Sequence, residues 1–334
     1  MSQLRLRWGV LGTARVARQR FVPAVRAGNE SEVLAIASRN AERARTVAAA
    51  LGVPRSYGSY EALLADPDVE AVYVALPNAL HTTWTIAAAW AGKHVLCEKP
   101  LAGRVADAER MAAACRGSGV LLMEAFMWRH HPQHARVRTL LDSGAIGEPS
   151  VMRASFSYML EPELASGPNV RLRPELAGGS LMDVGTYTVN AARWLFDAEP
   201  VSVMGQQVLE PGVAVDIAFG GVMRFPGERL ALIDCSFRQS LSNKYEIHGT
   251  EGRLLLDRAF RPDGLPGRLH LLRGDDDRQE VMPSTDQFAA EADHFARSVR
   301  AGRLLPPAED GVAQARIIQA LSTSAASGAA VRLA

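Results

Sequence analysis

A short apolar segment near the start of the chain ends in a glycine turn and leads into a segment that can form a helix. It reads RWGVLGTARVA, with Gly12 at the turn, Ala14 two residues later and Ala17 three residues after that. This order matches a dinucleotide-binding turn, in which small residues let backbone N–H groups approach a pyrophosphate. The helix N-terminus would add partial positive charge. A purely structural turn is the alternative interpretation.

The second apolar strand, 32–38, lacks the carboxylate that usually accepts from the ribose 2′-hydroxyl of NAD. It reads EVLAIAS and is followed by Arg39 and Asn40. The hydroxyl of Ser38 and the guanidinium of Arg39 suit a 2′-phosphate, so the sequence predicts NADP rather than NAD. The alternative is a helix-capping serine followed by a solvated arginine.

Composition and charge argue against several other classes of protein. The chain has 334 residues, enough for two domains, and a net charge of +1 without a basic block, which argues against nucleic-acid binding. Neither a membrane-spanning apolar run nor a signal-peptide pattern is present, so no membrane association is expected. Cys97, Cys115 and Cys235 form no metal-binding or disulfide spacing, which favours a reducing cytoplasm.

The order of predicted elements indicates an α/β protein with two domains. Strands and helices alternate at first, with strands expected at 6–11, 33–38, 71–75, 94–98 and 120–123 and helices at 14–26, 41–51, 60–65, 83–91 and 105–116. This alternation predicts a doubly wound parallel sheet, a Rossmann domain over residues 1–127. Long alternating strands follow, at 151–158, 201–208, 213–225, 230–239, 245–248 and 253–256, with helices at 133–141, 181–196, 287–300 and 311–327. They predict a C-terminal α+β domain over residues 128–334 with a large open, mostly antiparallel sheet.

A lysine follows the predicted strand 94–98, in the tripeptide Glu98-Lys99-Pro100. Ligands of doubly wound folds bind at the carboxyl ends of the strands. The ammonium of Lys99 can therefore point into the cleft beside a nicotinamide. A solvated lysine at a strand end is the alternative.

The segment GGSLMDVGTY, residues 178–187, opens a predicted helix. Asp183 and Tyr187 are four residues apart and so project from one helix face. A tyrosine hydroxyl held by a lysine ammonium can donate or accept a proton at a carbonyl or alcohol carbon. Asp183 could bind a substrate hydroxyl. The alternatives are a capping aspartate and a core tyrosine.

Seven segments, in order along nearly the whole chain, together resemble the Gfo/Idh/MocA family of sugar and cyclitol oxidoreductases. They are GVLGTARVA, SRN, LPNALH, EKP, EAFMWRHHPQ, GGSLMDVGTY and YEIHGTEGRL. The resemblance implies a Rossmann domain, a C-terminal domain with an open sheet, NAD or NADP as cofactor, and dimers or tetramers formed through the open sheet face. The chain resembles the members with tyrosine at the catalytic helix position, among them sugar dehydrogenases, dihydrodiol dehydrogenases and nucleotide-sugar ketoreductases.

The resemblance also assigns roles to individual residues. Lys99 and Tyr187 would be catalytic, and Asp183 would contact substrate. The peptide bond between Lys99 and Pro100 would be cis. The expected cofactor-binding residues are Gly12, Thr13, Ala14, Arg15, Ser38, Arg39, Leu76, Pro77, Asn78, His81, Glu98, Lys99, Trp128 and Arg129. Asn169 and Arg171 look like further substrate contacts, with a solvated loop arginine as the alternative.

The chain departs from the commonest family pattern in two places. Ala14 stands in the position of the second glycine, and Tyr187 replaces a frequent histidine, which argues against the inositol-dehydrogenase type of reaction. His130, His131 and His134 are expected to be cap and surface residues rather than metal ligands.

Together with these observations, the resemblance implies an NADP(H)-dependent oxidoreductase that acts on a sugar. Oxidation of a free aldose and reduction of a keto-sugar, including a nucleotide-linked one, both remain open. A dihydrodiol-type dehydrogenase and a non-catalytic NADP-binding regulatory protein are the alternatives. A metal-dependent dehydrogenase is disfavoured because the chain lacks a Cys/His ligand set.

Overall fold

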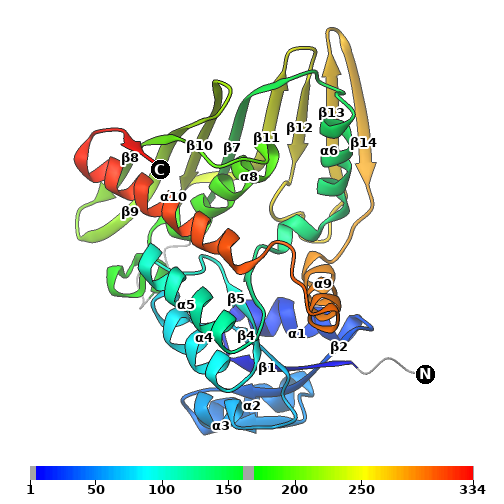
Figure 1. Cartoon of the computed structure of the whole chain (residues 1–334), viewed down its shortest axis with the longest axis vertical. Coiled ribbons are helices and arrows are strands. Elements are labelled where there is room, and N and C mark those ends of the chain that lie inside the picture. The colour runs from blue at the N-terminus through cyan, green and yellow to red at the C-terminus, as the bar shows by residue number, and fades with distance from the viewer. Residues whose placement is uncertain (1–4, 161–168, 334) are drawn as a thin grey trace. The chain divides into compact units, whose positions relative to one another are not determined.

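The computed structural model describes residues 5–160 and 169–333 and contains two compact units (Figure 1). The first unit comprises residues 1–130 and 286–312, and the second comprises residues 131–285 and 313–334. The first change of unit lies close to the boundary expected near residue 128. The return of the chain to the first unit at residue 286 was not expected from the sequence.

The first unit is built on a parallel sheet with the strand order β3-β2-β1-β4-β5-β6. Its strands are β1 (Leu6–Leu11), β2 (Ser31–Ala37), β3 (Arg55–Tyr57), β4 (Ala71–Val74), β5 (His94–Glu98) and β6 (Leu122–Ala125). The doubly wound parallel sheet is therefore confirmed. Strand β3 was missed because its three residues, RSY, form neither an apolar run nor an alternating pattern.

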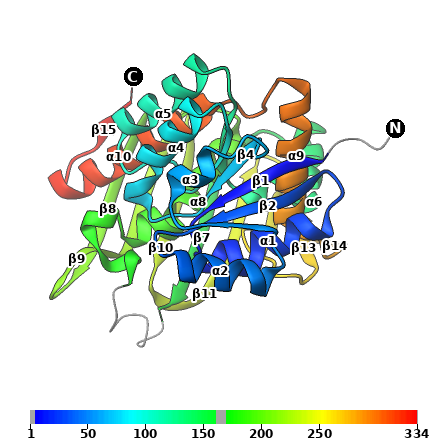
Figure 2. The same ribbon diagram turned by 90° about the horizontal axis from the view of Figure 1, so that it is seen from below.

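Helices cover both faces of this sheet. Figure 2 shows α1 (Val22–Ala27) and α2 (Ala41–Leu51) on one side and α3 (Tyr60–Leu64), α4 (His81–Trp90) and α5 (Val105–Gly117) on the other. The expected helix 14–26 is not a single α-helix, because a π-helical turn, η1 (Ala17–Phe21), precedes α1. Pro23 lies in the first turn of α1 and has no N–H to donate, so the α-helical hydrogen-bond pattern cannot continue across it.

An aromatic cluster holds helix α9 (Gln287–Ala301) in the first unit. Phe295 of α9 packs on Trp8 of β1 with ring centroids 5.2 Å apart, and Trp8 meets Phe21 edge to face at 5.3 Å. Phe21 in turn stacks on Tyr73 of β4 at 3.8 Å. All four rings are fully buried. Burial of this apolar surface explains why a helix so late in the sequence belongs to the N-terminal unit.

Glu291, one helical turn before Phe295, is a buried carboxyl group. It is fully buried, and neither side-chain oxygen has a hydrogen-bond partner among the described residues. Burial raises the pKa of Glu291 well above its usual value, and the nearby charge of Glu98 raises it further. Folding therefore favours the protonated form of this carboxyl group.

We expect Glu291→Gln to stabilise the protein at neutral pH. Because the pKa of Glu291 is higher in the folded than in the unfolded chain, its contribution to stability is complete below the unfolded pKa and is lost as the pH rises toward the folded pKa. The uncharged amide avoids this loss, which is about 1.4 kcal/mol for each tenfold increase in proton affinity on folding. Urea unfolding from pH 4 to pH 8 should show a gain in the variant that grows with pH. A difference that does not vary with pH would contradict a protonated Glu291.

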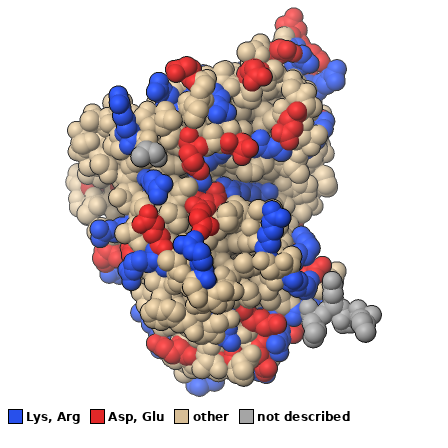
Figure 3. All heavy atoms as spheres, in the orientation of Figure 1, with Lys and Arg blue, Asp and Glu red and all other residues tan. Residues whose placement is uncertain are grey.

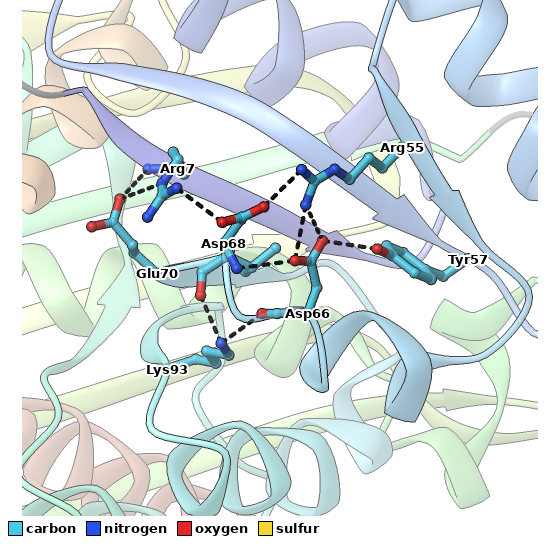
Figure 4. A network of polar contacts seen from close by, with 8 residues as sticks. Arg7, Arg55, Tyr57, Asp66, Asp68, Glu70 and Lys93 are labelled. Atoms are coloured by element: carbon cyan, nitrogen blue, oxygen red, sulfur yellow. Dashed lines mark hydrogen bonds and ion pairs between the residues drawn. The ribbon is translucent and has the colours of Figure 1, made fainter.

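A polar network links β3 to the segments that precede β4 and β5 (Figure 4). The guanidinium of Arg55 and the hydroxyl of Tyr57, both on β3, donate to the Asp66 carboxylate at 2.8 Å. Arg55 also pairs with Asp68, and the buried ammonium of Lys93 donates to the backbone oxygens of Asp66 and Val69. Asp66 and Lys93 precede β4 and β5, so their contacts lie away from the carboxyl strand ends where doubly wound folds bind ligands.

The second unit is built on an open sheet with the strand order β14-β13-β12-β11-β7-β10-β9-β8-β15. The strands are β7 (Pro149–Met159), β8 (Ser202–Glu210), β9 (Val213–Phe225), β10 (Arg229–Ser236), β11 (Arg238–Gly249), β12 (Arg253–Asp257), β13 (Gly267–Arg273), β14 (Asp276–Met282) and β15 (Val331–Arg332). Neighbouring strands are antiparallel except for the parallel pair β7–β10. The expected open, mostly antiparallel sheet is confirmed, although β13, β14 and β15 were not predicted as strands.

Helices of the second unit pack on one face of its sheet. They include α6 (Pro132–Asp142), α8 (Thr186–Phe196) and the larger part of α10 (Ala308–Ser327). The helix expected over 181–196 begins instead as a π-helical turn, η6 (Leu181–Gly185), before α8. On the opposite face, Met204, Val222 and Leu232 are exposed and pair across three adjacent strands. No helix of the described residues covers that face in Figure 1.

Charge on the surface is mixed in sign. On the face drawn in Figure 3, Lys and Arg side chains are interspersed with Asp and Glu rather than gathered into a patch of one sign. Cys97, Cys115 and Cys235 are buried free thiols. Among the residues that the structure describes, no helix has the length and apolar character needed to cross a membrane.

Candidate functional site

The glycine turn after β1 has the form that the sequence predicts. Gly12 has a φ of +100°, and a Cβ there would lie 2.7 Å from the backbone oxygen of Ala75. Both constraints exclude a side chain and bring the turn close to the end of β4. Helical backbone begins at Arg15, directly after Thr13 and Ala14. A pyrophosphate therefore fits this position, because a helix N-terminus follows a turn that has no side chain at Gly12.

The end of β2 presents Ser38 and Arg39 as expected. Asn40, not Ser38, caps α2, because its side chain accepts from the Arg43 N–H at 2.9 Å. The capping alternative for Ser38 is therefore wrong. Arg39 is exposed, and its guanidinium lies beside the hydroxyl of Tyr60, whose pKa is raised by burial and lowered by Arg39. No carboxylate follows the strand, so the donors here suit a 2′-phosphate.

His81 braces two loops of the predicted cofactor site. Its Nδ1 and Nε2 each lie 2.9 Å from a backbone oxygen, those of Pro100 and Leu76 respectively, and a neutral ring donates to one of them. The side chain is fully buried, and this burial lowers the pKa of His81. The structure thus assigns His81 to positioning the loop Leu76–Asn78 against the Lys99–Pro100 turn, rather than to direct contact with a ligand.

The carboxyl end of β5 carries Glu98 and Lys99. Glu98 accepts a hydrogen bond from the Tyr73 hydroxyl, and the Lys99–Pro100 peptide is cis, as expected. Two other predicted cofactor residues make internal contacts. Trp128 is fully buried, and Arg129 forms an ion pair with Asp310 at 2.8 Å.

In the second unit, an aspartate from β9 caps the start of the predicted catalytic helix. Asp216 Oδ2 accepts from the Ser180 hydroxyl at 2.6 Å and from the Leu181 N–H at 2.8 Å. Burial raises the pKa of Asp216, whereas these two hydrogen bonds lower it. Gly179, with a φ of +112°, makes room for the cap, because a Cβ there would lie 2.2 Å from Asp216 Oδ1. The glycine pair therefore sets the backbone that leads to Asp183 and Tyr187.

We expect Gly179→Ala to destabilise the protein by ~1–3 kcal/mol and to lower activity, because the methyl group strains the backbone and displaces the Asp216 cap. Gly220→Ala is the matched control. Its Cβ would meet only the backbone oxygen of Ile233 at 3.8 Å, and its φ is not in the left-handed region. Thermal unfolding of both variants tests the expectation, and equal stability would contradict it.

Two side chains hold the Asp183 carboxylate, one from strand β7 and one from the loop that precedes the helix. The hydroxyl of Tyr158, on β7, and the Nε of Arg171 each donate to Asp183 Oδ2 at 2.8 Å. Arg171 is thus paired with Asp183, although its side chain is 42% exposed. The Asn169 side chain accepts from the Arg171 backbone N–H at 3.1 Å and so holds the loop. Tyr158 and Asp216 were missed, since the sequence offers no local pattern that relates them to the helix.

Tyr187 lies in an aromatic environment. Its ring packs edge to face on Phe156 at 5.2 Å and lies tilted against Phe260 at 5.7 Å, and the residue is buried. The preceding residue, Thr186, is anchored by Gln314 of α10, which donates to its backbone oxygen at 2.8 Å. The backbone and ring of Tyr187 are therefore firmly positioned.

The histidine cluster after Trp128 has the expected cap but one unexpected core residue. The His131 side chain caps α6, and His130 packs against His294. His134 is fully buried and lies 2.9 Å from both the Tyr245 hydroxyl and the Ala259 backbone oxygen, so its expected surface position is wrong. Within the described residues, no group of three or more His, Cys, Asp or Glu side chains could hold a metal ion.

Comparisons with known proteins agree with this arrangement over both units. Residues 6–126 match the oxidoreductase family with an NAD-binding Rossmann fold that is designated Gfo/Idh/MocA, and residues 134–255 match the C-terminal domain of the same family. The chain belongs to the Gfo/Idh/MocA family of oxidoreductases. The resemblance seen in the sequence motifs is thereby confirmed.

Relatives within the family match nearly the whole chain. D-xylose 1-dehydrogenase (NADP(+)) 2 of Haloferax volcanii is 41% identical over 98% of this chain and 99% of its own length. A dTDP-3,4-didehydro-2,6-dideoxy-alpha-D-glucose 3-reductase of Actinomadura kijaniata is 38% identical over 96% of each chain. A crystal structure of a 3-ketoreductase from the same organism, in complex with NADP and TDP-benzene, has a TM-score of 0.90 at 36% identity and covers 96% of this chain and 98% of that one.

Proposed function

We propose that the protein is an NADP(H)-dependent oxidoreductase that interconverts a hydroxyl and a keto group of a sugar. One observation carries the proposal. This chain matches a family relative over nearly its full length, and it has Lys99 directly after β5, Asp183 in η6 and Tyr187 in the first turn of α8. Relatives named for NADP and for sugars match over both units, which supports the choice of cofactor and substrate class.

The residues of the first unit fit NADP. The turn at Gly12 would receive the diphosphate, and Ser38 with Arg39 would bind the 2′-phosphate through charge-assisted hydrogen bonds. The loop Leu76–Asn78, with Glu98, would surround the nicotinamide riboside, held in place by His81. When bound, the nicotinamide supplies or accepts the hydride.

The chain's own residues handle the proton and the charge at the reacting carbon. The hydroxyl of Tyr187 donates a proton to the carbonyl oxygen during reduction or accepts the alcohol proton during oxidation. The ammonium of Lys99 stabilises the negative charge that develops on these oxygens. Retention of both groups argues against a regulatory protein without turnover, which has no need of the pair.

A substrate panel, followed by NADPH absorbance at a single pH, tests the proposed function. The panel contains free aldoses such as D-xylose, trans-dihydrodiols and nucleotide-linked keto-sugars, each offered with NADP⁺ or NADPH. We expect turnover of at least one sugar, with NADP(H) preferred over NAD(H). Turnover of a dihydrodiol alone would place the protein among the dihydrodiol dehydrogenases, and the absence of all turnover would contradict an enzymatic role.

We further propose that a second copy of the chain covers the open sheet face of the second unit. Met204, Val222 and Leu232 form an exposed apolar row, which continues in register into the ion pair of Arg153 with Glu246. A twofold contact uses the same surface on both copies, so that surface must complement itself. This face meets the requirement, because it carries a positive and a negative side chain beside the apolar row.

Leu232→Arg should convert a homodimer or homotetramer into a smaller species, because it buries an unpaired charge in the contact. Leu265→Arg, at an exposed leucine in the turn between β12 and β13, is the control. Size-exclusion chromatography with light scattering measures the outcome. A wild-type monomer, or an unchanged mass for the Leu232 variant, would contradict this use of the open face.

A further inference from the structure

We propose that Tyr158 and Arg171 hold Asp183 as a fixed acceptor for one substrate hydroxyl, and thereby make the site select hydroxylated sugars over their deoxygenated analogues. The inference rests on the proposed function and adds to it a property of the substrate and a positioning role for Tyr158.

Two donors converge on one oxygen of the carboxylate. The Tyr158 hydroxyl and the Arg171 Nε both lie 2.8 Å from Asp183 Oδ2. They approach from different elements, since Tyr158 is on β7 and Arg171 is in the loop turn η4 (Val170–Leu172). A carboxylate held at one oxygen from two directions cannot rotate freely, so the direction of its remaining lone pairs is set before substrate arrives.

The protonation of Tyr158 suits this role. Burial raises the pKa of Tyr158, and the neighbouring charge of Asp183 raises it further, so the hydroxyl remains a donor at every physiological pH. Tyr158 is itself fixed by its ring contact with Phe237 at 5.5 Å. The Arg171 guanidinium balances the charge of Asp183, which allows a carboxylate to persist at a site that is partly removed from water.

Asp183 remains accessible to a ligand despite these contacts. Its side chain is 18% exposed, and it lies in the π-helical turn that leads directly to Tyr187. A carboxylate accepts hydrogen bonds but cannot donate them, so the substrate group that it recognises must carry a proton. A hydroxyl near the reacting carbon meets this condition, whereas a deoxygenated carbon desolvates the carboxylate without donating a hydrogen bond to it.

The chain offers a matched control for this arrangement. In the network of Figure 4, Tyr57 donates to Asp66 Oδ2 at 2.8 Å, and Arg55 pairs with the same carboxylate at 2.8 Å. The chemistry is that of Tyr158, Asp183 and Arg171, but the network belongs to the other unit. Tyr57→Phe therefore removes the same kind of hydrogen bond without touching the proposed site.

The experiment compares D-xylose with its 2-deoxy, 3-deoxy and 4-deoxy analogues, and a nucleotide-linked keto-sugar with and without its 2-hydroxyl. Each substrate is offered to the wild-type enzyme, to Tyr158→Phe and to Tyr57→Phe. The measured quantity is the ratio of kcat/KM for the hydroxylated sugar to kcat/KM for each analogue. We expect the wild type and Tyr57→Phe to prefer one hydroxylated sugar by ~10²-fold or more. In Tyr158→Phe this ratio should fall by ~10-fold, with unchanged NADPH affinity.

Arg171→Gln is a second, independent variant that should lower the same ratio, and thermal unfolding with NADPH binding establishes that each variant is folded. An equal ratio in wild type and Tyr158→Phe would overturn the inference while leaving the proposed function intact. A wild-type enzyme that turns over sugars without preferring a hydroxylated sugar to its deoxy analogue would also overturn the inference and leave the proposed function intact. If no sugar of the panel is turned over, the proposed function fails, and this inference fails with it.

Discussion

Tyr187→Phe should lower kcat by ~10²–10⁴-fold with little change in NADPH affinity. The substitution removes the proposed proton-transfer group but keeps the ring between Phe156 and Phe260, so the helix start should not move. Steady-state kinetics with the best sugar of the panel, together with NADPH titration, measure both quantities. Tyr245→Phe is the control, because it removes another buried hydroxyl of the same unit, which lies 2.9 Å from His134 Nδ1. Near-wild-type kcat in Tyr187→Phe would place the proton donor elsewhere.

Lys99→Met tests whether the two groups act together. Methionine has a similar length but no charge, so we expect a loss of kcat similar to that of Tyr187→Phe. If the ammonium acts through the tyrosine hydroxyl, the double variant should lose much less than the product of the two single losses. Losses that multiply would show that Lys99 and Tyr187 serve separate steps.

Arg39→Ala should weaken NADPH binding by ~10–100-fold and leave NADH binding nearly unchanged. The reason is that the guanidinium makes a charge-assisted contact with the 2′-phosphate, worth ~1.5–3 kcal/mol, and NADH has no such phosphate. Fluorescence titration of both cofactors measures the effect. Arg45→Ala is the control, because Arg45 is also exposed near this end of the sheet but pairs with Glu42 on α2. Equal weakening of both cofactors by Arg39→Ala would mean that Arg39 contacts something other than the 2′-phosphate.

The features that the sequence predicts correctly are those set by short stretches of chain. The glycine turn is determined locally, because Gly12 alone can adopt its positive φ beside Ala75. The alternation of apolar strands and helices likewise predicts the parallel sheet. Each of these depends on backbone preference or burial periodicity within about ten residues.

Other features depend on strand register and on packing between distant segments. Tyr158 reaches Asp183, and Asp216 reaches Ser180, only because β7 and β9 bring them beside the start of the proposed catalytic helix. Phe295 returns to Trp8 across almost the whole sequence, which carries α9 into the N-terminal unit. No local pattern encodes these pairings, because the free energy that favours them comes from burying surfaces together once the sheets have formed. The sequence alone therefore determined the Rossmann turn and the candidate reactive groups, whereas the tertiary structure decided which side chains orient them.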